Sequence, residues 1–296
     1  VDASGFYRTT LLPSPGSPAT ERAAAVADHW AQVLAGRVGH GSFLELAGSL
    51  ADDTDLGVWQ AILGGLTTLD VLAPGQFAGR AAEILGPPIE RLGWEASPAD
   101  DDRSRQLRGL VLAAGGTVAA VDHVIAGARA LWDTPIDDPA VATAVVVIVS
   151  AHGDADAYAE CRERARRAET AQVEQRHLRA LTRFPGSDEV ATLLDELLDG
   201  GIRNQDAPYL LRDALAHQWH RGFVWQAVTD RWDEVTSRFP SNSIARMLEG
   251  VRSLVDADTD PDVEAFLQAH PVPQGSLQVA QHLERRRVNQ RLAERL

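Results

Sequence analysis

The feature that most constrains the fold of this sequence is the helical periodicity of its apolar residues, which is clearest between residues 221 and 255. Apolar side chains recur there at offsets of three and four, so that each set shares one face of a helix. Pro240 divides the stretch, because proline has no N–H to donate. The pattern predicts amphipathic helices over 221–237 and 241–255, the second capped by a Ser or Asn side chain at 241–243. The two apolar faces consist of Trp225, Val228, Trp232 and Val235, and of Ile244, Met247, Leu248, Val251, Leu254 and Val255.

Segments of the same kind fill most of the chain. Gly, Pro and Asp mark the joints between them, as at Pro74-Gly75, Pro87-Pro88 and Gly200-Gly201. Short helices joined by tight turns pack as antiparallel neighbours. We therefore expect an all-α fold, a HEAT- or armadillo-like α-helical superhelix (solenoid), although the sequence has no exact period. The predicted helices are 18–36, 41–51, 54–72, 75–92, 99–115, 117–132, 138–151, 153–168, 169–183, 187–199, 206–219, 221–237, 241–255, 260–269 and 275–295.

The beginning of the chain departs from the helical pattern. Residues 5–11 are aromatic and β-branched, which is typical of a β-strand, and no second strand candidate of similar quality follows. A strand without a partner leaves its backbone N–H and C=O groups unpaired. We therefore expect residues 1–12 to be the last strand of a sheet from another domain together with the start of a linker. Residues 13–296 then form the helical domain, and the chain is interpreted as a fragment.

Composition argues against several classes of partner. The net charge of −14 is unsuited to a nucleic-acid backbone, which needs clustered basic residues, and equally to an anionic membrane surface. The longest apolar run, residues 141–149, is about half the length needed to span a bilayer. Cys161 is the single cysteine, so an internal disulfide cannot form. This suits a reducing compartment, and we expect a cytoplasmic location.

The sequence contains no complete motif for a catalytic metal. The pattern H-E-x-x-H, in which two His hold zinc and Glu activates water, is absent. His217 and His220 are the nearest approach, but no acid follows in register. We favour a structural role for them over a cryptic metal hydrolase. Cys161 lies among arginines, which can lower a thiol pKa, although a packing role is favoured.

Two charged clusters also have simpler interpretations. The acids at 256, 258, 260 and 262 imitate a calcium loop, but Pro261 and Leu267 occupy positions that require glycine and a bidentate acid. Capping of the following helix explains these acids better. The basic run at 285–287 could meet an acidic patch on another domain, which we consider the less favoured interpretation.

Short motifs spread in order along the chain carry a family resemblance. Residues 222–233 followed by Arg238-Phe239-Pro240 resemble the signature near the end of the aminopeptidase N family, which are zinc-dependent metallopeptidases of the gluzincin type. Residues 5–8 resemble the strand that ends the family's β-sandwich, with Thr9 in place of the usual valine. Further matches are Val58-Trp59, residues 91–94, Leu107-Arg108 with Val111-Leu112, residues 203–206, residues 263–266, His270-Pro271, Gln281, Leu283-Glu284 and residues 287–289.

This resemblance implies that the chain is the C-terminal helical domain of such an enzyme, like that of the endoplasmic-reticulum aminopeptidases. The parent would remove N-terminal residues from peptides with one zinc ion held in a catalytic domain absent here. This chain also lacks the family's G-x-M-E-N segment, so we expect it to be non-catalytic and to hold no metal. Its expected partners are the N-terminal and catalytic domains of the same polypeptide and, in the parent, a peptide substrate.

The leading hypothesis is therefore a domain that caps the active site and controls peptide access. The alternative is a free-standing HEAT-like adaptor for protein partners. Arg203, Gln205 and Asp206 are the candidate substrate contacts, because an arginine in the inner cavity could attract a peptide's terminal carboxylate. A purely structural role, in which the Arg-Asp pair fixes a helix joint, is slightly favoured.

Overall fold

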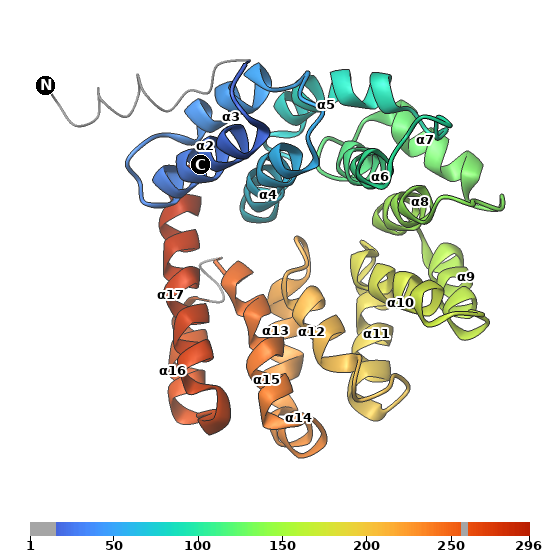
Figure 1. Cartoon of the computed structure of the whole chain (residues 1–296). Helices are drawn as coiled ribbons and strands as arrows, with labels where there is room; N and C mark the ends of the chain where they lie inside the picture. The colour runs from blue at the N-terminus through green and yellow to red at the C-terminus, as the bar shows by residue number, and fades with distance from the viewer. Residues whose placement is uncertain (1–15, 256–259) are drawn as a thin grey trace, which may run out of the picture. The chain divides into compact units, whose positions relative to one another are not determined.

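A computed structural model describes residues 16–255 and 260–296, with side chains omitted for 260–262. Every regular element within these ranges is helical, which confirms the all-α class (Figure 1). The strand expected at 5–11 and the linker before Gly16 lie outside the described residues. No helix in the described ranges is both long and apolar enough to cross a bilayer.

Contacts divide the chain into two compact units, Val1–Ile148 with Leu296, and Val149–Arg295. In the first unit, α2 packs on α4 and α4 on α6, while α3 packs on α5. Alternate helices therefore form two layers, which is the local arrangement of a helical superhelix. The helices are α2 (Ala19–Leu34), α3 (His40–Ser49), α4 (Leu56–Leu72), α5 (Ala78–Leu92), α6 (Asp102–Gly116) and α7 (Asp122–Leu131), followed by α8 (Pro139–Ala151), in which the division between the units falls.

The second unit repeats this arrangement. Helix α12 packs on α10 and on α15, and α15 packs on α17, while α11 packs on α13. The helices are α9 (Ala155–Arg166), α10 (Ala171–Ala180), α11 (Ser187–Asp199), α12 (Ala207–Leu215), α13 (Arg221–Asp230), α14 (Trp232–Arg238), α15 (Ser241–Met247), α16 (Asp260–Ala269) and α17 (Ser276–Ala293). Short 3-10 turns are η1 (Leu181–Arg183), η2 (Leu248–Ser253) and η3 (Pro273–Gly275).

The stretch at 221–255 buries the apolar faces that its periodicity predicts, except for the half-buried Val255, but its helices are shorter than expected. Arg231 leaves the helical conformation, with φ −111° and ψ 26°, and separates α13 from α14. Its guanidinium pairs with Asp199 and Glu234, which holds this turn against α11. Trp225 and Trp232, on either side of the break, both form T-shaped ring contacts with Phe266 on α16.

Two further details differ from the sequence-based expectation. The residue before α15 is Pro240 itself, and no side chain at 241–243 caps the helix. The carbonyl of Pro240 instead accepts the N–H groups of Ser243 and Ile244. Helix α5 continues through Pro87 and Pro88, which agrees with the predicted range 75–92 but not with the use of this pair as a joint marker. Neither proline has a backbone N–H, so the helix lacks two hydrogen-bond donors at this point. The side chain of Pro88 is buried by packing.

Candidate functional site

Helix α12 lies at the centre of the second unit and carries candidate residues at both ends. It packs against α10, α11, α13 and α15. Its apolar face is fully buried, so the helix is a fixed support for the loops that flank it. The buried residues of this face are Leu210, Leu211, Ala214 and Leu215.

The predicted substrate-contact cluster lies at the N-terminal end of α12. Arg203 donates from Nε to Asp206 Oδ2 and from Nη2 to Glu174 Oε2, both at 2.9 Å. Asp206 also accepts from Gln175 Nε2 at 2.9 Å, and its side chain is only 12% exposed. Because Glu174 and Gln175 belong to α10, this network ties the start of α12 to that helix. Gln205 is exposed and lies beside the network.

Arg238, from the Arg-Phe-Pro motif, holds the loop that leads into this cluster. Gly200 ends α11 in the left-handed region, with φ 102°, which favours glycine. Arg238 donates from Nη1 to the carbonyl oxygen of Leu198 at 2.8 Å and from Nη2 to that of Ile202 at 3.1 Å. It also donates from Nε to Asn204 Oδ1 at 2.7 Å. The motif residue therefore caps α11 and sets the loop path, a role that sequence reasoning did not assign.

His217 fixes the turn at the other end of α12. Its Nε2 lies 3.0 Å from the carbonyl oxygen of Phe184, and Nδ1 accepts the N–H groups of Trp219 at 3.1 Å and His220 at 3.2 Å. These contacts require the neutral tautomer with the proton on Nε2. Burial lowers the pKa of His217 to about 4, which keeps the ring neutral.

His220 completes this turn, because its Nε2 contacts the carbonyl oxygen of Pro185 at 2.6 Å. The two histidine rings lie 5.1 Å apart between centroids. Since both nitrogens of His217 already bind backbone groups, a metal would have to displace them. The geometry therefore favours the structural role over the metal-hydrolase hypothesis.

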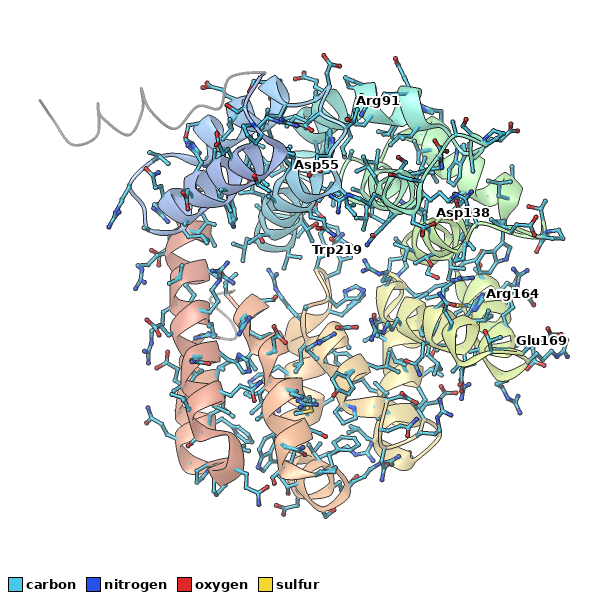
Figure 2. The ribbon with its side chains drawn as sticks, viewed as in Figure 1. Asp55, Arg91, Asp138, Arg164, Glu169 and Trp219 are labelled. Carbon is cyan, nitrogen blue, oxygen red and sulfur yellow. The ribbon has the colours of Figure 1, made fainter. Side chains whose placement is uncertain are left out.

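Two large apolar side chains are exposed beside this turn. Trp219 is 57% exposed and Phe223 is 50% exposed. Figure 2 shows Trp219 on the turn that joins α12 to α13, and Phe223 lies in the first turn of α13. The sequence predicted a helix over 206–219, with residue 219 as its last residue. The helix ends at Leu215, so the turn presents Trp219 to solvent instead.

A shallow pocket of about 390 Å³ lies along α9 and the start of α10. Charged residues that line the pocket form ion pairs with one another. Arg164 Nε lies 2.7 Å from Glu160 Oε1, and Arg167 Nε lies 2.6 Å from Glu163 Oε1. Figure 2 labels two of its lining residues, Arg164 and Glu169. This pairing indicates that the arginine-rich segment is a solvated face.

Cys161 is buried on α9 and does not have the reactive environment considered from the sequence. Its Sγ lies 3.5 Å from the carbonyl oxygen of His177. Burial raises the pKa of the thiol to about 12, despite the neighbouring arginines. The desolvation of the thiolate therefore outweighs their attraction, which corrects the idea of a lowered pKa.

Two arginines of the basic run at 285–287 bind other residues of the same unit. Arg286 is 1% exposed and donates from Nε to the carbonyl oxygen of Leu254 at 2.6 Å. Arg287 pairs with Glu264 on α16 at 2.6 Å. These two side chains therefore stabilise α17 rather than forming a continuous basic surface. The acidic cluster at 256–262 lies outside the residues whose side chains are described.

The described residues bring together no set of side chains of the kind that holds a catalytic zinc ion. In the described ranges, no group of three or more His, Cys, Asp or Glu residues is placed to hold a metal ion. The sequence as a whole lacks H-E-x-x-H. We therefore derive no catalytic step through a metal from these residues.

Comparison with known proteins gives a match over nearly the whole chain. Aminopeptidase M1-A of Oryza sativa subsp. japonica is 24% identical over 324 residues, an alignment that covers 99% of this chain and 36% of the relative. Aminopeptidase M1-C of the same plant is 22% identical over 326 residues, covering 99% of this chain and 37% of the relative. The chain thus spans just over a third of the length of these curated relatives. A family profile described as "ERAP1-like C-terminal domain" matches residues 2–288, and the chain belongs to this family.

Proposed function

We propose that this chain is the non-catalytic C-terminal part of a zinc-dependent aminopeptidase, in which it borders the active site and controls peptide access. The observation that carries the proposal is the family match over residues 2–288. The aminopeptidase relatives align with 99% of the chain but extend far beyond it, which supports further domains on the same polypeptide. In this proposal those domains supply the zinc ion and the catalytic residues, and residues 13–296 act as one helical domain.

The two-layer helical packing supports a wall or cap rather than a catalytic centre. Stacked helical layers present extended surfaces, and such surfaces suit the exclusion of folded proteins and the admission of flexible peptides. The lone Cys161, buried and without a second cysteine in the sequence, supports a reducing compartment, and we place the protein in the cytoplasm.

We extend the proposal to the cluster at the start of α12. Arg203 and Gln205 are exposed, and we assign them contacts with the peptide. Asp206 is mostly buried against α10, so it acts by orienting the Arg203 guanidinium. If this assignment holds, Arg203→Ala in the parent raises KM for peptides severalfold. It should lower stability by about 1 kcal/mol, because the Arg203 side chain is 54% exposed and Asp206 keeps its hydrogen bond from Gln175. An unchanged KM would leave the cluster with only its helix-joining role.

The test of the main proposal compares three proteins. These are the complete polypeptide encoded by the reading frame, the same polypeptide without residues 16–296, and this chain alone. The complete protein should hydrolyse an amino-acid p-nitroanilide and lose that activity on chelation, whereas this chain should not. Removal of residues 16–296 should let a folded protein substrate compete with short peptides. Chelator-sensitive hydrolysis by this chain alone would refute the assignment.

A further inference from the structure

Helix α17 is attached to the second unit mainly through polar side chains. Its buried residues recur at offsets of three and four, so they form one face of the helix. Three of the five residues of this face are polar, whereas the buried residues of α11 and α12 are all apolar. The docking of α17 therefore depends more on directional hydrogen bonds than on apolar burial. The face consists of Val279, His282, Arg286, Asn289 and Leu292.

The polar side chains of this face bind backbone carbonyl oxygens of α15, of η2 and of the residue that follows η2. The contacts join His282 Nε2 to Ala245 at 3.0 Å, Arg286 Nε to Leu254 at 2.6 Å and Asn289 Nδ2 to Arg252 at 2.8 Å. Helix α17 packs on α15, η2 and η3, and it lies at one edge of its unit (Figure 1). A helix in such a position can open without the rest of the unit, because few packing contacts are lost.

His282 can accept no further proton while α17 is docked. Arg252 donates from Nε to Nδ1 of the His282 ring at 3.0 Å. Because a guanidinium group has only donors, Nδ1 must be unprotonated, and the proton of the neutral ring lies on Nε2, where it is donated to Ala245. Protonation of Nδ1 would set an N–H against the N–H of Arg252 and place two positive charges side by side.

The charged groups around His282 disfavour the protonated ring. Burial lowers the pKa of His282, and the positive charge of Arg252 lowers it further. The hydrogen bond to Ala245 and the carboxylate of Glu249 act in the opposite direction without offsetting this effect. That carboxylate accepts from Arg252 Nη1 at 3.0 Å, so its charge is shared with a cation. Other charged residues on these elements are Arg246 of α15 and, within about one turn of His282 on α17, Glu284, Arg285 and Arg286.

We propose that His282 makes the docking of α17 sensitive to pH, so that protonation of its ring releases this helix while the rest of the unit stays folded. In the released helix His282 is solvated and has its ordinary pKa of 6.5. The released form therefore binds more protons than the docked form, and docking weakens as the pH falls. If the docked ring stays neutral, the docking equilibrium constant falls by up to about tenfold between pH 7.5 and pH 5.5. This inference concerns the chain itself and does not rest on the proposed function.

Hydrogen exchange measured by mass spectrometry on this chain at pH 7.5 and pH 5.5 tests the proposal. Labelling times are adjusted for the pH dependence of intrinsic amide exchange. The amides of residues 276–293 should exchange about three- to tenfold faster, relative to intrinsic rates, at pH 5.5 than at pH 7.5. The amides of α12 should keep their protection. Carboxylates such as that of Glu249 stay ionised at both pH values, since carboxyl groups titrate near pH 4.

Three variants assign the effect to one ring. His282→Gln provides an amide nitrogen that can donate to Ala245 but does not titrate, so it should remove the difference between the two pH values. His270→Gln is the matched control, because it removes an exposed histidine of α16, and it should retain the difference. Arg252→Gln should reduce the difference, because its amide can rotate to donate to the neutral ring or to accept from the charged one. This last variant keeps the proposal testable if His282→Gln does not fold.

Several results would overturn the inference. One is equal protection of α17 at the two pH values in the wild type. Another is the same acid response in the wild type and in His282→Gln or, where that variant does not fold, in Arg252→Gln. A loss of protection in α12 that accompanies the loss in α17 would show unfolding of the whole unit instead of release of one helix.

Discussion

His217 gives the most direct test of how the turn beside α12 is held. We consider the substitution His217→Asn, whose side-chain oxygen can take the place of Nδ1 as the acceptor for the N–H groups of Trp219 and His220. The shorter side chain cannot reach the carbonyl oxygen of Phe184, which then lacks a donor in a buried position. An unsatisfied buried carbonyl costs about 1–3 kcal/mol. The variant should therefore be less stable than the wild type by this amount at pH 7.

The pH dependence of the free energy of unfolding provides a second, independent test of the buried, neutral His217. The pKa of His217 falls from 6.5 to about 4 on folding, because burial penalises the charged ring. Between these values the unfolded chain binds a proton that the folded chain does not, so stability falls as the pH falls. For a shift of this size, the contribution lost between pH 7 and pH 4.5 is about 2 kcal/mol. The asparagine variant does not titrate here and should lack that part of the loss.

Urea unfolding followed by circular dichroism at pH 7 and pH 4.5 measures both the loss of stability at pH 7 and the further loss on acidification. His29, His177 and His282 also have pKa values lowered mainly by burial, and they contribute to the same pH window. They are present in both proteins, so their contributions cancel in the difference between wild type and variant. An identical pH dependence in the two proteins would refute the assignment of a buried, neutral His217. So would a variant of unchanged stability at pH 7.

Two further predictions concern packing and reactivity. Gly65→Ala should lower the free energy of unfolding by about 1–3 kcal/mol, because a Cβ there would lie 2.2 Å from Cζ of the buried Phe43 ring. Gly64→Ala, the neighbouring control with nothing within 4 Å of its Cβ, should instead raise it by up to about 1 kcal/mol through helix propensity, both measured by urea unfolding. The thiol of Cys161, with its pKa raised to about 12, should react with a thiol reagent at pH 8 at least about a hundredfold more slowly than in the urea-unfolded chain. Equal rates before and after unfolding would contradict its burial.

The sequence predicted most helices because their apolar residues keep one spacing over several turns. Leu56, Trp59, Leu63 and Leu66 in α4 are buried as that spacing requires. Helix α11 begins and ends where the pattern places it, since Gly200 supplies a left-handed C-terminal residue. Such signals are local, so they can be interpreted without knowledge of the fold.

The details that sequence reasoning missed depend on contacts between distant residues. Arg238 reaches the carbonyl oxygens of Leu198 and Ile202, and His217 reaches that of Phe184. Backbone carbonyls occur at every residue, so no spacing rule identifies which of them a side chain will meet. Arg231, at the break between α13 and α14, likewise forms ion pairs with Asp199 of α11 and Glu234 of α14. The composition of the Arg203 cluster was predictable, but its connection to α10 was not.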